Sequence, residues 1–233
     1  RRALVEHYRM PVEVRQRRRP PLNEKIWLSR DVREALTRLF RGKCAFCEQP
    51  VEAGFSEGVH HFRPLGNAQG RSKQSQSPDH YGWLAYEWSN LLLTCQECSR
   101  SKGSLFPVEG ARALLLGTWD EAVEQERALT VDPCSVDPGR YLRFGRKGAA
   151  IGKGPVGHST IETLSLNREG LLSARSSKFD HAVEQLGTMR DRSDVAAEGL
   201  SAALADDSPF SGSLELLLID TFRLAGQTIR MRQ

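Results

Sequence analysis

Two adjacent histidines, His60 and His61, stand in the stretch GVHHFRPLG, and the whole chain holds six histidines. The ordinary pKa of histidine lies close to neutral pH, so this side chain serves both as a general base and as a metal ligand. Such a pair can lie on the surface without a function, bind zinc or act in catalysis. The surrounding sequence has to decide among these three interpretations.

Four of the five cysteines form two Cys-x-x-Cys pairs that bracket the histidines. Cys44 pairs with Cys47 and Cys95 pairs with Cys98, while Cys134 stands alone. In an intracellular chain, this spacing favours metal binding over disulfides. Two such turns aim four thiolates at one point, which is the closed tetrahedral arrangement of structural zinc. The alternative is four buried free cysteines, and Cys134 is predicted to be a buried free thiol.

Further polar residues accompany the histidines in a fixed order. Arg63 lies two residues after the pair, Asn90 precedes the second cysteine pair, and Ser99 and Lys102 come just after it. Hydrolysis of a phosphodiester needs a base that deprotonates water and a cation that stabilises charge on the phosphate. The residue types in this set are suited to that chemistry.

The motifs resemble those of the HNH endonucleases, a family with the ββα-metal fold. The segments FRGKCAFCE, VHHFRP, LAYEWSNLLLTCQECSRSKGSLFP, DPGRYLRF and IETLSLNREGL are similar to PtuB-like HNH subunits of Septu-type anti-phage systems and related retron cassettes. The resemblance covers roughly residues 31–192. It implies that two strands carry the histidines, a loop carries the asparagine and a helix carries the last metal ligand.

The resemblance also implies roles for individual residues. His61 would be the general base, and Asn90 would orient its ring through a side-chain hydrogen bond. His60 would bind a catalytic Mg²⁺ or Mn²⁺ ion, while Arg63 and Lys102 would hold phosphate. The bracketing cysteines would hold a structural zinc ion.

Ser99 departs from the family pattern, because relatives carry Asn or His there as the second ligand of the catalytic metal. Three interpretations stay open. Mg²⁺ keeps several waters and can rely on His60 and phosphate oxygens. Asp79 or His80 can substitute as a ligand. In the third interpretation the site is inactive and the protein only binds nucleic acid.

Hydrophobic spacing indicates the elements that must position these residues. A capping serine, Ser29, and an apolar stripe predict a helix over residues 28–43. Residues 51–62 predict two short strands that turn near residues 56–58. Because neighbouring strand residues point to opposite faces, the two histidines can share one site only where their strand ends or bulges, as Pro64 favours.

The predicted fold class is α+β, with a ββα-metal unit and two zinc knuckles followed by a mostly helical region. We predict a basic N-terminal arm over residues 1–28, a zinc-stabilised HNH nuclease domain over 29–107 and a partner-docking region over 108–233. The last region should contain a hairpin over residues 140–154 and two helices after it. For the arm, a disordered segment and a phosphate-contacting segment are equally favoured.

Composition sets further bounds. The chain has 233 residues, 39% of them hydrophobic and 27% charged, with a net charge of +4. Such a mild positive charge permits nucleic-acid binding without requiring it. No apolar run is long enough to span a bilayer, and no apolar signal segment opens the sequence. We therefore expect a cytoplasmic protein with no membrane partner. The sequence begins without Met, which leaves its true N-terminus open.

We therefore predict a metal-dependent HNH endonuclease that cleaves DNA in a bacterial anti-phage defence system. The resemblance implies an ABC-type ATPase partner of the SMC or RecN kind. The alternatives are a catalytically weak or inactive zinc-knuckle nucleic-acid-binding subunit, which Ser99 favours, and an RNA-cleaving nuclease. Ordinary packing or solvent exposure is the favoured interpretation for several other conspicuous residues, namely Trp83, Tyr86, Trp88, His158, His181, Arg140 and Arg143.

Overall fold

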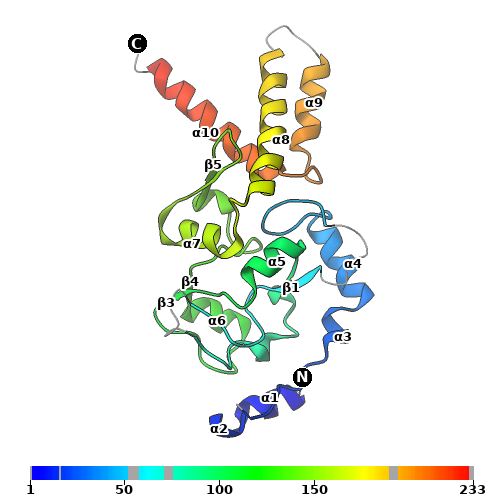
Figure 1. Ribbon diagram of the computed structural model, residues 1–233, viewed down its shortest axis with the longest axis vertical. Helices are drawn as coiled ribbons and strands as arrows, with labels where there is room; N and C mark the ends of the chain where they lie inside the picture. The colour runs from blue at the N-terminus through cyan, green and yellow to red at the C-terminus, as the bar shows by residue number, and fades with distance from the viewer. Residues whose placement is uncertain (1, 16, 52–57, 71–75, 189–193, 231–233) are drawn as a thin grey trace.

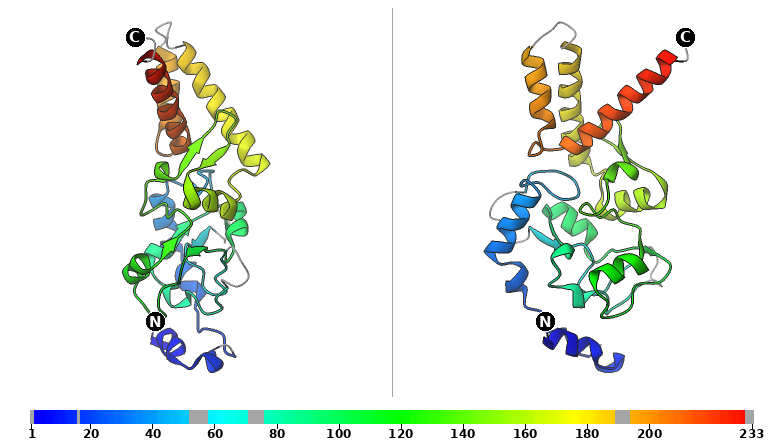
Figure 2. Two further views of the ribbon diagram at one scale, coloured as in Figure 1. Left: turned by 90° about the vertical axis from the view of Figure 1, so that its left-hand side faces the viewer. Right: turned by 180° about the vertical axis from the view of Figure 1, so that it is seen from behind.

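A computed structural model of the chain describes residues 2–15, 17–51, 58–70, 76–188 and 194–230. Helices α8, α9 and α10 lie at one end of an elongated molecule, and α1 and α2 lie at the other (Figure 1, Figure 2). The α-helices are α1 (Arg2–Arg9), α2 (Val12–Arg15), α3 (Glu24–Trp27), α4 (Arg30–Leu39), α5 (Gln96–Lys102), α6 (Trp119–Gln125), α7 (Gly154–Leu164), α8 (Glu169–Thr188), α9 (Asp194–Leu204) and α10 (Ser211–Arg230). The mixed α+β content agrees with the predicted fold class.

The strands of the described residues form three separate two-stranded antiparallel sheets, which pair β1 with β2, β3 with β4 and β5 with β6. Their bounds are β1 (Val59–His61), β2 (Leu91–Leu93), β3 (Val108–Glu109), β4 (Arg127–Ala128), β5 (Leu142–Phe144) and β6 (Ala150–Gly152). Three short 3-10 helices complete the structure, namely η2 (Gly82–Leu84), η3 (Trp88–Asn90) and η4 (Pro138–Arg140).

The first sheet carries the histidine pair. In its register Val59 lies opposite Leu93 and His61 lies opposite Leu91. All three residues of β2 are buried, so this strand lies inside the core. The predicted strand with the histidines is therefore present, and its partner is β2. The turn predicted near residues 56–58 falls largely on residues 52–57, which lie outside the described part of the chain.

Helix α4 confirms the helix predicted before the first cysteine pair. The Ser29 hydroxyl accepts a hydrogen bond from the Val32 backbone N–H at 3.4 Å, which satisfies one unpaired donor of the first turn. Leu36 is completely buried, whereas Leu39 of the predicted apolar stripe is 54% exposed. The buried face of α4 is thus narrower than the apolar spacing predicted.

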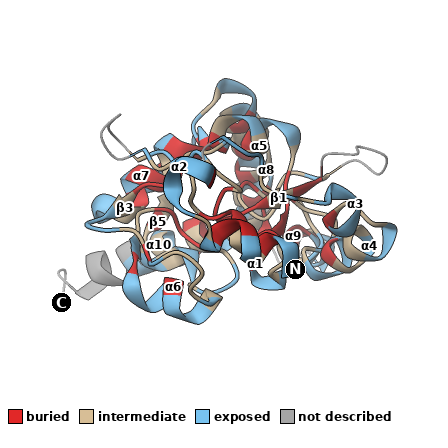
Figure 3. Ribbon diagram, turned by 90° about the horizontal axis from the view of Figure 1, so that it is seen from below, coloured by how far each residue is buried: buried red, intermediate tan, exposed pale blue. Residues whose placement is uncertain are grey.

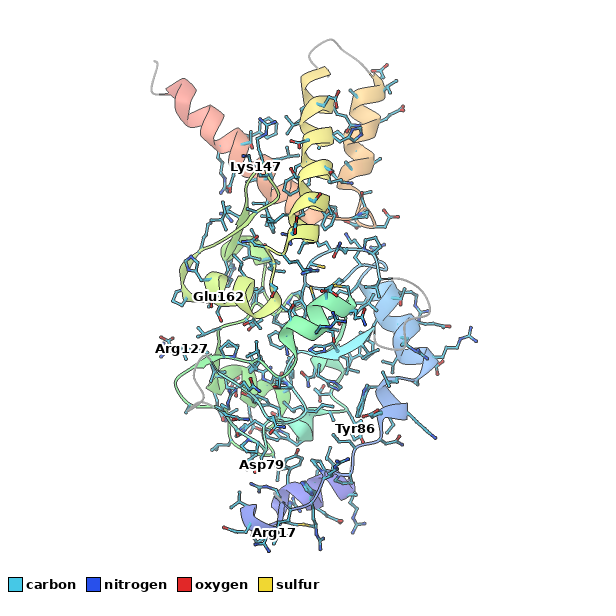
Figure 4. The ribbon with its side chains drawn as sticks, in the orientation of Figure 1. Arg17, Asp79, Tyr86, Arg127, Lys147 and Glu162 are labelled. Carbon is cyan, nitrogen blue, oxygen red and sulfur yellow. The ribbon has the colours of Figure 1, made fainter. Side chains whose placement is uncertain are left out.

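The N-terminal segment is folded against the rest of the protein, so its interpretation as a disordered arm is wrong. Leu4 and Tyr8 on α1 are buried, and α1 lies across this end of the molecule (Figure 3). Arg15 donates to the backbone carbonyls of Tyr8 and Met10, and its Nη2 atom lies 3.0 Å from Asp79 Oδ2. Figure 4 labels Asp79, which lies near the N-terminal helices. Few of the basic residues in this segment are buried, and phosphate contact by the others stays a prediction.

Three hydrophobic clusters form the core, and each joins ranges that the sequence assigned to separate domains. One contains Trp27 and Val59, a second contains Phe62 and Ala122, and the third joins the cysteine pairs to the C-terminal helices. The division of the chain into three functional ranges stays a prediction. The hydrophobic packing continues across both predicted boundaries. Among the described residues, every helix is too short or too polar to cross a bilayer.

The region after residue 108 contains the expected hairpin, formed by β5 and β6. The Gly148 Cβ position would lie 2.3 Å from the Leu172 carbonyl oxygen, so only glycine lets this turn approach α8. The two predicted helices correspond to α7 and α8. Arg143 in β5 forms an ion pair with Asp220 of α10 at 2.9 Å, which corrects its interpretation as a solvated side chain.

Candidate functional site

The four cysteines of the two pairs form one cluster. Their sulfur atoms all lie within 4.8 Å of one another. Ligands on a tetrahedral zinc ion at about 2.3 Å lie about 3.8 Å apart, and the Sγ atoms of Cys47 and Cys95 are separated by 3.6 Å. The cluster can therefore hold a metal such as zinc, as the spacing predicted.

Local structure explains how each pair reaches this cluster. The first pair lies in a tight turn after α4, where the Cys44 backbone N–H donates to the Gln49 carbonyl at 2.8 Å. The second pair begins α5, since Cys95 is its N-cap and its Sγ accepts from the Cys98 N–H at 3.5 Å. Cys134 lies apart and is exposed, so the prediction of a buried thiol is wrong for it.

His61 is held inside the protein with one ring nitrogen engaged. Its Nε2 atom lies 3.0 Å from the Ala85 carbonyl oxygen, and its ring packs edge-on against Trp27 with centroids 5.1 Å apart. A carbonyl oxygen only accepts hydrogen bonds, so Nε2 carries the proton in this contact. Burial lowers the pKa of His61 to about 4, which makes the ring neutral at pH 7. A neutral ring with hydrogen on Nε2 has its lone pair on Nδ1.

His60 contacts a different element. Its Nδ1 atom lies 3.0 Å from the Ser99 hydroxyl on α5, while its Nε2 atom is buried without a hydrogen-bond partner. Burial, with help from the nearby Lys102 cation, lowers the pKa of His60 well below its usual range. Ser99 and His60 therefore lie close together, as expected for two ligands of one metal. In this structure, however, their side chains contact each other.

The role predicted for Asn90 in orienting the His61 ring is wrong. The Asn90 side chain accepts from the Arg63 N–H at 2.6 Å and donates to the carbonyls of Arg63 and Leu84 at 3.1 and 3.2 Å. The completely buried amide therefore ties the chain after β1 to the end of η2. The Ala85 carbonyl, next to Leu84, takes the orienting role, so Asn90 acts on the ring only through the backbone.

The two cations predicted to hold phosphate are both buried. Arg63 is 2% exposed, forms a 3.1 Å ion pair with Glu126 and lies 4.5 Å from the centre of the Trp119 ring. Lys102 is completely buried and donates to the His61 carbonyl at 3.2 Å. Burial lowers the pKa of Lys102 to about 7. In this conformation both cations support the backbone around the histidines, and contact with phosphate stays a prediction.

Neither proposed substitute for the second metal ligand is free. Asp79 is engaged by Arg15, as described above. The His80 ring contacts the Ser77 hydroxyl at 2.6 Å through one nitrogen and the Ala113 carbonyl at 2.9 Å through the other. These contacts place both residues in the packing between the N-terminal helices and the segment before α6.

The other conspicuous aromatic and histidine residues have mixed environments. Trp83 donates to the Gly117 carbonyl at 2.8 Å, and the Tyr86 hydroxyl accepts from the Asn23 N–H at 2.7 Å, so both belong to the packing. Trp88 is 46% exposed and remains accessible for stacking. His158 and His181 are exposed, as predicted.

Sequence reasoning missed one residue at the cysteine cluster. Arg168 donates toward the sulfur atoms of Cys47, Cys95 and Cys98 over distances of 3.6–3.8 Å. It lies 70 residues after Cys98, and no spacing rule connects an isolated arginine to a distant metal site. The local sequence offers one signal for Arg168, namely its position directly before helix α8.

The cluster predicts that the protein binds about one zinc ion per chain. Cys98→Ser should reduce the zinc content and lower the melting temperature, because it removes a completely buried thiol from the cluster. Cys134→Ser is the matched control and should keep both values, since its thiol is exposed and outside the cluster. Elemental analysis and thermal denaturation measure both. A zinc-free wild-type protein would contradict the prediction.

Two curated proteins from Bacillus mycoides (strain KBAB4) are similar to the chain. Septu protein PtuB is 32% identical over 148 residues, which cover 62% of this chain and 50% of the relative. Septu protein PtuA is 32% identical over 144 residues, which cover 62% of this chain and 20% of that relative.

The chain thus spans half or less of the length of these relatives. No family model matches it, and no solved structure matches it. The similarity confirms the Septu-type resemblance drawn from the motifs, and over 62% of its length the chain is similar to the Septu proteins.

Proposed function

We propose that this protein is a metal-dependent HNH endonuclease that cleaves DNA in anti-phage defence, with His61 as its general base. The observation that carries the proposal is the environment of this ring. It is buried, neutral and fixed through Nε2 at the end of β1, which leaves Nδ1 as a proton acceptor. The sheet of β1 and β2 and the following helix α5 supply the β-β-α order that an HNH unit needs.

His61 would remove a proton from the attacking water. A base with a pKa of about 4 stays unprotonated throughout the physiological range, although its intrinsic basicity is modest. The Ala85 carbonyl fixes the ring orientation and stabilises the ring as it becomes positively charged. The backbone clamp of Asn90 and the Lys102 contact to the His61 carbonyl hold the end of β1 in place.

His60 would hold the catalytic Mg²⁺ or Mn²⁺ ion through Nε2. A metal-binding histidine normally gives its other ring N–H to a polar partner, which fixes the tautomer. The Ser99 hydroxyl is placed for that role at Nδ1, and the buried Nε2 atom has no partner. Ser99 then orients the ligand instead of binding the metal. A bound ion would stabilise negative charge on the phosphate.

The two histidines would approach the substrate from opposite faces of β1. His60 contacts α5, whereas His61 contacts the segment after η2 and α3. Alternation along a strand produces this separation. His61 is the last residue of β1, so a scissile phosphate that lies across the strand end can meet both rings.

The relationship to two Septu proteins supports a partner subunit. We propose an ABC-type ATPase of the SMC or RecN kind, docked on residues 108–233, because the sequence resemblance implies such a partner.

One observation favours a second function, a zinc-knuckle module that binds nucleic acid without cleaving it. Within the described part of the chain, the four cysteines are the one group of three or more potential His, Cys, Asp or Glu ligands. A catalytic metal at the histidines would therefore have fewer than three such ligands among the described residues and would depend on water and phosphate for the rest. Parallel cleavage and binding assays with DNA and RNA, with the ATPase present, show whether the nucleic acid is cleaved or only bound. They also show whether the substrate is DNA or RNA.

His61→Ala should reduce the cleavage rate by a factor on the order of 10²–10⁴, because the general base is lost. His61→Asn tests the same role with a smaller change in packing against Trp27. Both variants should retain zinc and bind DNA. His181→Ala, which changes an exposed histidine, is the control and should cleave normally. Equal activity of wild type and both His61 variants would leave the binding module as the better function.

The cleavage rate should remain level around neutral pH and fall only as the pH drops through about 4. Protonation of His61 below that pH removes the acceptor, so activity is lost toward acid. An ordinary histidine would place this loss near 6.5. Rates measured against pH, with circular dichroism to exclude acid unfolding, test the assignment. A loss of activity centred between pH 6 and 7 would argue against it.

Ser99→Ala should raise the Mg²⁺ concentration needed for half-maximal cleavage by about 10–100-fold, because the His60 ring loses the partner that orients it. The maximal rate at saturating metal should change less. Ser101→Ala on the same helix is the matched control. An unchanged metal requirement for Ser99→Ala would show that the hydroxyl has no part in metal binding.

A further inference from the structure

Arg168 lies between α7 and α8, and its side chain contacts the cysteine cluster. Its Nη2 atom is 3.6 Å from Cys47 Sγ and 3.8 Å from Cys95 Sγ, and its Nη1 atom is 3.7 Å from Cys98 Sγ. The same guanidinium donates to the Gln49 side chain at 3.1 Å. One arginine therefore reaches three of the four candidate zinc ligands.

The charge of a filled centre explains why an arginine belongs there. Four thiolates around one Zn²⁺ carry a formal charge of −2, and the site is buried apart from Cys95. A buried charge needs a compensating partner. Arginine stays protonated and offers several donors in one plane, so it can contact separate sulfur atoms at once, which a lysine cannot do with the same geometry.

A second contact links the first cysteine turn to another C-terminal helix. The Glu48 carboxylate accepts from the backbone N–H groups of Gly212 and Ser213 at 2.9 Å each. These donors belong to the first turn of α10, where an anionic acceptor is favoured by the helix dipole. Glu48 lies directly after Cys47, so the turn that carries two of the candidate metal ligands also caps α10.

The hydrophobic core joins the same parts. Cys44, Cys47 and Cys98 pack in one cluster with Phe179 of α8 and Leu214 of α10. A loss of the metal would place like charges or unpaired thiols inside this core. The arrangement of the cysteine turn is thus physically connected to the position of both long helices.

We propose that Arg168 is a positioning residue of the metal centre, and that the metal centre fixes α8 and α10 on the rest of the protein through Arg168 and Glu48. Metal binding and docking of the C-terminal helices are then one event. This inference depends on zinc in the cysteine cluster and is independent of nuclease activity, so the two can fail separately.

Zinc release to a metallochromic chelator tests the role of Arg168. Arg168→Met removes the charge at similar length and should speed zinc release or weaken zinc affinity by about 10–100-fold. Arg168→Lys keeps the charge and should fall between wild type and Arg168→Met. Arg146→Met, which changes an exposed arginine of the β5–β6 turn, is the matched control. Folded Arg168→Met protein that releases zinc at the wild-type rate would overturn the inference.

Hydrogen exchange on the full chain tests the link to the helices. Removal of zinc from the wild-type protein should increase exchange in α8 and in the first turn of α10, with a smaller change in α1. Glu48→Gln should increase exchange at the start of α10 while zinc is still bound, because the charged cap is lost. Unchanged protection of α8 and α10 after zinc removal would overturn the coupling.

Discussion

The convergence of four cysteine sulfurs on one point is the constraint on which the rest of the site depends. Cys47 and Cys95 are 48 positions apart, and the chain between them carries both histidines and Asn90. Closing a loop of that length costs about 3–5 kcal/mol of chain entropy. Structural zinc binding supplies about 10–16 kcal/mol, so a metal in this cluster can more than offset the cost. Short strands such as β1 and β2 would be marginal without that closure.

Inside the closed loop, neutral polar contacts set the properties of the histidines. The Asn90 amide clamps the backbone after β1, and the Ala85 carbonyl holds the His61 ring. Burial then lowers the pKa of the ring and keeps it neutral. The rigid environment thus selects one tautomer, while Ser99 plays the corresponding part for His60. These contacts fix two imidazole rings on a strand pair that would be too short to be stable alone.

Much of this arrangement could be predicted where a rule relates spacing to geometry. The Cys-x-x-Cys spacing predicted the cluster, and Ser29 predicted the start of α4. Contacts between distant segments had no such rule. The Asn90 amide bonds a backbone 27 residues away, and Arg168 reaches sulfur 70 residues away. Basic composition left a disordered arm and a phosphate-contacting arm equally favoured, because charge patterns do not reveal that Tyr8 and Arg15 are buried.

The protonation state of His61 offers the most direct test of the central claim, that this ring is a neutral base fixed through Nε2. Nitrogen-15 NMR of the histidine rings in the zinc-bound protein reports the tautomer and its titration. The account predicts hydrogen on Nε2, a bare Nδ1 and a neutral ring from pH 8 down to about pH 5, with protonation near 4. A ring that carries its hydrogen on Nδ1, or one that is positively charged at pH 7, would contradict it.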